Sequence, residues 1–250
     1  MRGKTWGGRL KRRLRKPPNG IEAWLKHNTE PVKDEPRRYV GAYMMRDLPC
    51  FLKLYRSRFY LHVLPALLRV SKPHFTFRRA VALASYGVPI PRPMTCVMVR
   101  EGLLLLNESI DGARDYDALS QEQSSADEVR RMMHCAGGTI AAMHMAGYTH
   151  SDCQWRNLLW SGRECYLVDL DSVRRRRFLV RRGRARDVAR FVVSAEQARL
   201  RPDLLEVFLK AYLEVVRTER ETLLARMQPQ LEKLRLQQEK QHGITAQPLL

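Results

Sequence analysis

Alternating apolar and polar residues predict strands in the first half of the chain. Two segments, RRYVGAYMM (37–45) and CFLKLYR (50–56), flank a turn at RDLP, and the stretch 93–110 predicts two more strands around the turn REG. Between these pairs the spacing is helical over 75–87, and a glycine there is expected to end the helix. A shorter helix is predicted over 21–28. The first half therefore combines a small sheet with helices.

From residue 125 onward the apolar period is helical. Ser125 and Glu128 have the spacing of a capping box, which marks a helix start. Four side chains of this helix are expected in the core: Met132, Ile140, Met143 and Met145. A short apolar strand, ECYLVDLDSV (164–173), follows a loop, and the segment 185–236 has helical patterns. The polar stretch 231–243 is expected to fray or project.

This order of elements predicts an α+β fold with a small antiparallel sheet followed by a mainly helical part. The predicted domain boundaries are a basic N-terminal arm (1–20), a first lobe (21–108), a second lobe (109–235) and a polar C-terminal tail (236–250). With 250 residues and 44% hydrophobic residues, the chain is long enough for one large domain or two lobes.

Charge narrows the choice of partners. The formal net charge is +19, with an isoelectric point near 10.3, so we expect a polyanionic partner: nucleic acid, an anionic membrane surface or a phosphorylated substrate. We find no apolar run of membrane-spanning length and expect no secretory signal. The five cysteines are odd in number and lack CxxC spacing, which argues against a disulfide framework and a zinc site and favours a reducing cytosol.

The strongest candidate chemistry lies in HSDCQWRN (150–157), followed by LVDLD (167–171). The pattern H-x-D-x-x-x-x-N, then a short strand and an aspartate, resembles the catalytic loop and metal-binding aspartate of the protein-kinase-like fold. Phosphoryl transfer needs a hydroxyl aimed at the γ-phosphate and cations on the phosphate oxygens. Asp152 would orient that hydroxyl and accept its proton, while Asn157 and Asp169 supply the oxygen ligands that Mg²⁺ prefers. His150 and Asp171 are candidates for supporting roles.

The upstream part of such a site requires a lysine on the third strand. Lys53 alternates with apolar residues in FLKLYR and would pair with the α- and β-phosphates of ATP. The adenine would contact backbone groups of Asn107, Glu108 and Ser109. No G-x-G-x-x-G loop is present, and no acidic residue occurs between Leu48 and Arg100, so the usual glutamate partner of the lysine is missing. We therefore predict that Lys53 pairs with Asp169.

Several motifs between about 37 and 200 together resemble the bacterial lipopolysaccharide kinase family, which contains the Kdo and core-heptose kinases: FLKLYR, GVPIPRP, LLLLNESIDGA, HMAGYTHSDCQWRNLL, YLVDLDSVRRRR and RARDVARFVVSA. The resemblance implies a protein-kinase-like fold of two lobes that uses ATP and Mg²⁺. Asp152 would be the catalytic residue, Lys53 the ATP-binding lysine, and Asn157 and Asp169 the metal ligands. The H-x-D-C arrangement at 150–153 favours a heptose hydroxyl of the lipopolysaccharide inner core as the acceptor.

The arginine-rich segment after the aspartate strand supports an anionic acceptor. We predict that Arg174, Arg175, Arg176 and Arg177 bind anionic groups of the substrate, because arginine binds phosphate and carboxylate bidentately. The lipopolysaccharide precursor lies at the inner membrane, and each basic residue near an anionic leaflet contributes about 1 kcal/mol. The resemblance thus predicts a cytoplasmic monomer held peripherally on the inner face of the inner membrane, with the basic arm at 2–16 assisting.

Other functions are compatible with parts of this pattern. The fold could serve a RIO-type protein kinase, an aminoglycoside-type kinase or a pseudokinase, and the charge alone would also suit a nucleic-acid-binding protein. The last of these leaves the ordered Asp152, Asn157 and Asp169 unexplained, and we find no nucleic-acid-binding signature. Cys153 is interpreted as a small packing residue, although its position beside Asp152 predicts sensitivity to thiol reagents.

Overall fold

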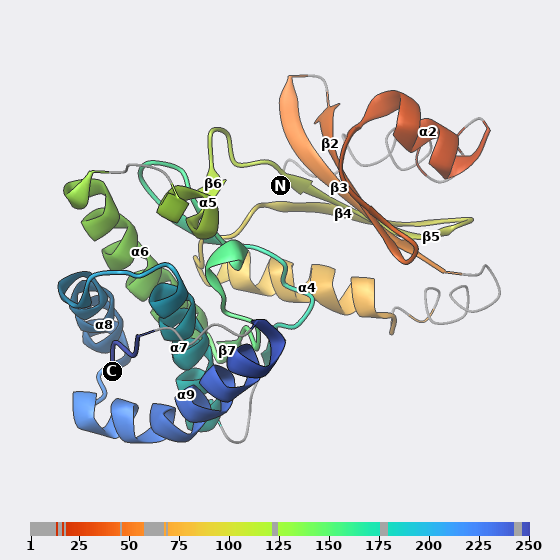
Figure 1. Ribbon diagram of the computed structural model, residues 1–250. Coiled ribbons are helices and arrows are strands. Elements are labelled where there is room, and N and C mark those ends of the chain that lie inside the picture. The colour runs from red at the N-terminus through yellow and green to blue at the C-terminus, as the bar shows by residue number, and fades with distance from the viewer. Residues whose placement is uncertain are drawn as a thin grey trace. The chain divides into compact units, whose positions relative to one another are not determined.

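A computed structural model describes residues 14, 17, 19–45, 47–57, 68, 70–121, 125–175, 180–242 and 247–250. The basic residues predicted to form the arm, together with Arg176 and Arg177, lie outside this part of the chain. Two compact units are formed, one by Met1–Ala82 with Pro91–Asp111 and the other by Leu83–Ile90 with Gly112–Leu250 (Figure 1).

The first unit is built on a five-stranded antiparallel sheet in the order β1-β2-β3-β5-β4. Its strands are β1 (Glu30–Glu35), β2 (Arg38–Met45), β3 (Leu48–Arg56), β4 (Pro93–Val99) and β5 (Gly102–Glu108). The last four were predicted, although β3 begins two residues before the expected CFLKLYR. The first was missed because EPVKDE has no apolar alternation, and this exposed edge strand is specified by its pairing with β2.

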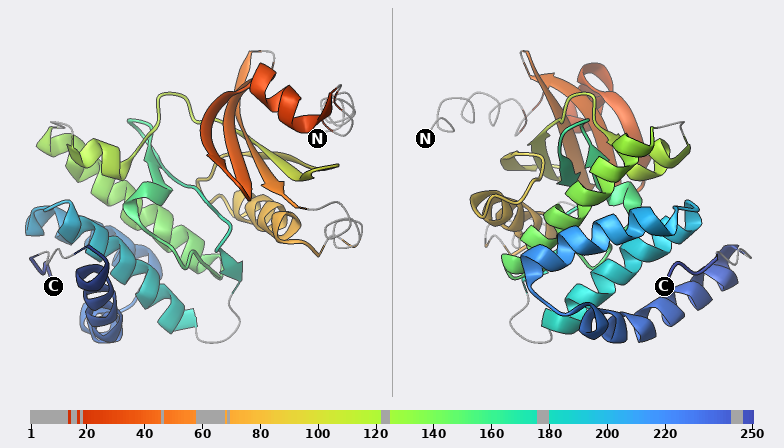
Figure 2. Two further views of the ribbon diagram at one scale, coloured as in Figure 1. Left: turned by 45° about the vertical axis from the view of Figure 1, so that its right-hand side comes forward. Right: turned by 90° about the vertical axis from the view of Figure 1, so that its left-hand side faces the viewer.

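Helix α2 (Gly20–Asn28) lies against this sheet, as Figure 2 shows, and its buried side chains join the core of the sheet. Ile21 and Leu25 are completely buried in the same core as Leu52 and Leu54, which occupy alternate positions of β3. At the end of β3, Arg56 donates 2.7 Å hydrogen bonds to the carboxylates of Glu22 in α2 and Asp34 in β1. The predicted short helix is thus confirmed and is fixed to two strands.

Helix α4 (Lys72–Ser85) follows β3 in the chain and contains no acidic residue. It ends as predicted, because Gly87 takes a left-handed φ of 73° that stops the helix. The N–H of Val88 then donates to the carbonyl of Leu83. The boundary between the two units falls within the last turn of this helix.

The second unit is mainly helical, with α5 (Tyr116–Gln121), α6 (Ala126–Met145), α7 (Val180–Gln197), α8 (Pro202–Val216) and α9 (Arg220–His242). The predicted start of α6 is confirmed by a 3.2 Å hydrogen bond from the Glu128 N–H to the Ser125 hydroxyl. Helices α6 and α8 pack closely because Gly137 leaves no room for a side chain: an added Cβ would lie 2.5 Å from the Phe208 carbonyl oxygen. Helix α7 packs against α9.

One core residue of α6 was predicted wrongly. Met132, Ile140 and Met143 are buried as expected, but Met145 is 54% exposed. Met145 is the last residue of α6 and lies about 200° around the helix from the buried Met143, so its side chain leaves the buried face. The apolar character of Met145 did not predict its exposure, because exposure also depends on the angular position of the residue on the helix.

Short strands complete the second unit. A three-stranded sheet contains β6 (Arg114–Asp115), β8 (Leu158–Trp160) and β9 (Cys165–Leu167), of which the last two form the strand pair expected after the loop. A separate pair joins β7 (Tyr148–Thr149) to β10 (Arg174–Arg175). Within the described residues, no helix combines the length and the hydrophobicity needed to cross a bilayer.

The polar end of α9 continues as helix where the sequence suggested fraying. Arg235 pairs with Glu196 of α7, whose side chain is only 1% exposed, and this carboxylate also accepts the N–H of Leu249. A buried carboxylate therefore holds the last helix and the residues 247–250 against α7.

Candidate active site

Helix α7 runs along the loop that leads from β7 to the 3-10 turn η1 (Trp155–Asn157), and it contacts that loop at successive turns. At Gly183 an added Cβ would lie 2.9 Å from the Thr149 side chain. One turn later Asp187 binds the loop backbone, and two turns after that the Ser194 hydroxyl accepts the N–H of Trp155 at 3.4 Å. These helix residues are four and seven positions apart, which is about one and two helical turns, so they form one stripe.

Asp187 is the centre of a buried polar network. Its carboxylate, which is completely buried, accepts the N–H groups of His150 at 2.6 Å and Ser151 at 2.8 Å. It also contacts His144 Nε2 at 3.2 Å, and His144 Nδ1 lies 2.9 Å from the Tyr212 hydroxyl. A carboxylate can only accept, so Nε2 carries the proton and Nδ1 accepts from Tyr212. Burial lowers the pKa of His144, which agrees with this neutral form.

His150 joins the loop to the segment that carries Asp169. Its buried ring donates from Nε2 to the Val168 carbonyl at 2.9 Å, and the Val168 N–H donates to the Asn157 carbonyl at 3.0 Å. Ser151 and Asp169 have left-handed φ values of 69° and 50°, a conformation that costs free energy in residues other than glycine. The hydrogen bonds on both sides hold the backbone in this conformation, so His150 has a positional role.

Asp152 and Asn157 meet within the loop. The Asn157 amide nitrogen donates to the backbone carbonyl of Asp152 at 2.8 Å and to its Oδ2 at 3.2 Å, while Gln154 donates to Oδ1 at 2.9 Å. Both partners of the Asn157 nitrogen are acceptors, which fixes the orientation of the amide. Its oxygen is therefore the atom left to bind a cation. Amide and carboxylate oxygens are ligands that suit Mg²⁺, and the assignment of Asn157 and Asp169 as metal ligands stays a prediction.

The other predicted residues of this unit lie close by in sequence and fold. Asp171 is in the turn between β9 and β10. Arg174 and Arg175 form β10 and pair with Thr149 and Tyr148, directly before His150, and both are exposed. The structure thus places two of the four predicted anion-binding arginines beside the start of the loop.

Four residues of this site were missed from the sequence: Asp187, His144, Tyr212 and Arg190. Arg190 of α7 lies 3.6 Å from Asp152 Oδ1 and Arg156 lies 3.8 Å from Oδ2. The available signal was Asp187, the single acid among the arginines of 174–190. A lone acid among basic residues, on a helix with apolar neighbours, indicates a buried carboxylate that binds backbone N–H groups.

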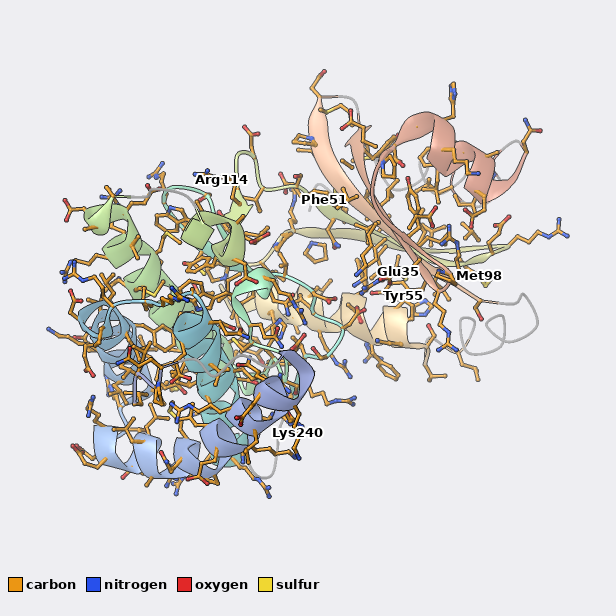
Figure 3. All side chains as sticks on the ribbon, in the orientation of Figure 1. Glu35, Phe51, Tyr55, Met98, Arg114 and Lys240 are labelled. Carbon is orange, nitrogen blue, oxygen red and sulfur yellow. The ribbon has the colours of Figure 1, made fainter. Side chains whose placement is uncertain are left out.

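Lys53 lies in the first unit, at the middle of β3, where it pairs with Val40 of β2 and Leu105 of β5. Its Nζ is 5.2 Å from the centre of the Tyr55 ring. Figure 3 labels Phe51 and Tyr55, which occupy the alternate positions on either side of it. Its pairing with Asp169 of the second unit stays a prediction.

The predicted adenine-contacting residues lie at the end of β5. The N–H of Glu108 donates to the Arg92 carbonyl at 2.9 Å, and the N–H of Ser109 donates to the Pro49 carbonyl at 2.8 Å. The Glu108 carboxylate pairs with Arg92 at 2.7 Å. These two N–H groups are therefore engaged within the sheet. A nucleotide contact from Asn107, Glu108 or Ser109 would have to use other backbone atoms.

Sequence comparison identifies the relatives of this chain. The family described as "Lipopolysaccharide kinase (Kdo/WaaP) family" matches residues 22–212. A 3-deoxy-D-manno-octulosonic acid kinase of Vibrio parahaemolyticus is 32% identical over 104 residues, which cover 40% of this chain and 42% of the relative. The enzyme of the same name from Stenotrophomonas maltophilia is 32% identical over 103 residues, or 38% of this chain and 39% of the relative. The chain thus spans about two fifths of the length of these relatives.

Structural comparison supports the predicted fold class over most of the chain. The solved structure of WaaP in complex with acyl carrier protein has a TM-score of 0.63 and 20% identity, covering 91% of this chain and 97% of that one. An aminoglycoside-3'-phosphotransferase of type VIII has a TM-score of 0.55 and 15% identity, covering 85% and 98%. The protein-kinase-like fold, with an antiparallel sheet and a mainly helical remainder, is confirmed.

Proposed function

Because this chain belongs to the lipopolysaccharide kinase (Kdo/WaaP) family, we propose that it transfers the γ-phosphate of ATP to a sugar hydroxyl of the lipopolysaccharide inner core. The observation that carries the proposal is the loop geometry around Asp152. The Asp152 carboxylate is 31% exposed and accepts hydrogen bonds from Asn157 at 3.2 Å and from Gln154 at 2.9 Å, within a loop whose backbone is fixed by the buried Asp187.

In the proposed mechanism, Asp152 orients the acceptor hydroxyl and takes its proton as the oxygen attacks phosphorus. Gln154 and Asn157 each donate to one carboxylate oxygen and so restrict its rotation. Such positioning matters because the reaction depends on in-line geometry more than on covalent help from the protein.

For the nucleotide, we propose that Lys53 binds the α- and β-phosphates and that backbone atoms of 107–109 contact the adenine. Asn157 and Asp169 would hold Mg²⁺, which neutralises charge on the phosphate oxygens when bound. The absence of acids from α4 supports Asp169 as the partner of Lys53. Lys53→Ala is then expected to raise KM for ATP.

The acceptor is proposed to be 3-deoxy-D-manno-octulosonic acid (Kdo) on the lipid A precursor. The names of the similar curated enzymes favour Kdo over the heptose expected from the H-x-D-C motif. The exposed Arg174 and Arg175 support contact with an anionic glycolipid, and we propose a monomer that binds peripherally at the inner face of the inner membrane.

The test is phosphate transfer by the purified chain from radiolabelled Mg-ATP to Kdo-lipid A or to a heptose-extended acceptor. Asp152→Asn should lower kcat by at least about 100-fold with an unchanged circular dichroism spectrum. Asp127→Asn, an exposed change on α6, is the matched control and should leave the rate unchanged. Transfer to the heptose-extended acceptor alone would replace Kdo by heptose as the proposed acceptor. Label in protein or RNA, with none in glycolipid, would refute the proposed function.

A further inference from the structure

Two guanidinium groups approach the carboxylate of Asp152 from different elements. Arg156 comes from η1 and lies 3.8 Å from Oδ2, and Arg190 comes from α7 and lies 3.6 Å from Oδ1. Both distances exceed those of an N–H···O hydrogen bond, so these are charge contacts only. The short bonds to the carboxylate come instead from Gln154 and Asn157.

Arg190 differs from the neighbouring arginines of α7 that face the same loop. Arg184 donates to the His144 carbonyl and Arg186 to the Ser151 hydroxyl, each at 2.7 Å. Within the described residues, the guanidinium of Arg190 makes no hydrogen bond at all; its Nε is buried without a partner, as are those of Arg184 and Arg186, but the terminal nitrogens of Arg190 also have no hydrogen-bond partner. A buried donor in this state costs free energy unless a ligand satisfies it.

Cationic groups flank Asp152 on two sides. Arg156 faces Oδ2 while the Asp117 carboxylate also acts on it, and Arg190 faces Oδ1, so both guanidinium groups lie beside the carboxylate that the acceptor hydroxyl must approach. Each guanidinium has five N–H donors in a planar fork that matches a carboxylate or phosphate. The arrangement is therefore suited to an acceptor that carries an acidic group close to its reacting hydroxyl.

We propose that Arg156 and Arg190 form an anion-recognition site that binds the carboxylate of the acceptor sugar and sets the preference for an acidic acceptor. This inference rests on the proposed function, and Kdo carries such a carboxylate whereas an unphosphorylated heptose does not. The site differs from the segment 174–177 that the sequence suggested, because it is defined by two side chains that flank the reacting carboxylate.

The γ-phosphate of ATP is an oxyanion of similar chemistry, and the experiment separates the two sources. Initial rates are measured with Kdo-lipid A and with the same acceptor carrying a carboxamide in place of the Kdo carboxylate. Both are measured for wild type, Arg156→Gln, Arg190→Gln and Arg190→Lys. Arg131→Gln, an exposed change on α6, serves as the control.

For wild type we expect kcat/KM to be about 10- to 100-fold higher with the acid than with the carboxamide, as expected for charge-assisted hydrogen bonds. Arg156→Gln and Arg190→Gln should lower the value for the acid by a similar factor, lower the carboxamide value much less, and leave KM for ATP unchanged. Arg190→Lys should recover part of the preference. If Arg190→Gln does not fold, Arg156→Gln carries the test, because this side chain is 60% exposed.

Three results would overturn the inference. The wild type could use both acceptors equally, the variants could slow both acceptors equally, or the loss could appear in KM for ATP, which assigns the arginines to the donor phosphate. In each case transfer to Kdo-lipid A still occurs and the proposed function stands. A wild type that phosphorylates neither acceptor refutes the proposed function and the inference together.

Discussion

Two neighbouring parts of the loop 149–157 are held by different interactions, and we call the first of them, His150 with Ser151, the anchored end. At the start of the loop, the backbone N–H groups of His150 and Ser151 donate to the completely buried carboxylate of Asp187 at 2.6 and 2.8 Å. Further along, the partly exposed Asp152 has two cationic neighbours at 3.6 and 3.8 Å. The first set is short, buried and internally complete, whereas the second is longer and open to water.

This difference separates what fixes the loop from what the loop offers to a ligand. A buried carboxylate with all its donors in place holds a strained backbone, including the left-handed Ser151. The charged groups around Asp152 are only loosely paired, so a substrate can replace their contacts with one another.

Removal of the anchor should have the largest effect on stability. Asp187→Ala leaves two backbone N–H groups and His144 Nε2 without an acceptor in the interior, and we expect the free energy of unfolding to fall by about 3–5 kcal/mol. Asp152→Ala should change it by less than about 1 kcal/mol, because its ion pairs are partly exposed. Urea denaturation followed by circular dichroism measures both. Equal effects would contradict the division.

Acid should weaken the anchored end through His144. Burial lowers the pKa of His144 in the folded state below its ordinary value of 6.5, so the unfolded chain binds more protons at mildly acidic pH. The stability from the neutral ring is fully present above pH 6.5 and is lost as the pH falls below it, by at most about 1.4 kcal/mol per pH unit.

The matched variant is His144→Gln, which can donate to Asp187 but does not titrate. The difference between the urea midpoints at pH 7.5 and pH 5.5 should be smaller for this variant than for wild type. Parallel losses in the two proteins would show that another group is responsible.

The hydroxyl at the far side of the network should have a smaller effect. Tyr212→Phe leaves His144 Nδ1 without its donor, and we expect a loss of about 1 kcal/mol in the free energy of unfolding. Tyr86→Phe is the control, since the Tyr86 side chain is exposed and the change should be neutral. A neutral Tyr212→Phe would place the anchor in Asp187 alone.

Thiol labelling should show that Cys153 is protected within the loop, and it should do so without a change in stability. Cys153 is 1% exposed and burial raises its pKa well above the ordinary value, so little reactive thiolate is available. A thiol reagent should modify the half-buried Cys96 and Cys135 first, and Cys153→Ser should leave the early labelling unchanged. Rapid loss of activity that disappears in Cys153→Ser would restore the reagent sensitivity suggested by the sequence.

Much of the fold could be predicted because its signals are local. The apolar patterns of β2 to β5, the Ser125 cap and the Gly87 stop each depend on a few neighbouring residues. The order of Asp152, Asn157 and Asp169 is likewise a short spacing, and the structure places Asp152 in contact with Asn157.

The parts that escaped prediction depend on distant contacts. Asp187 reaches its loop partners across 36 and 37 residues, and His144 reaches Tyr212 across 68. Strand β1 needs β2 to exist, and Met145 needed the phase of α6. Short windows of a single sequence contain no information about contacts between residues this far apart.

The stripe of α7 has a consequence for how this protein can change over evolution. The positions that hold the loop, Gly183, Asp187 and Ser194, belong to one set, while Arg190 and Arg156 belong to another that flanks Asp152. If the second set contributes as little to folding as its partial exposure suggests, its members can be exchanged without first acquiring a stabilising mutation. Under the proposed function, a library that randomises 156 and 190 while keeping the first set constant is a direct route to kinases for new sugar acceptors.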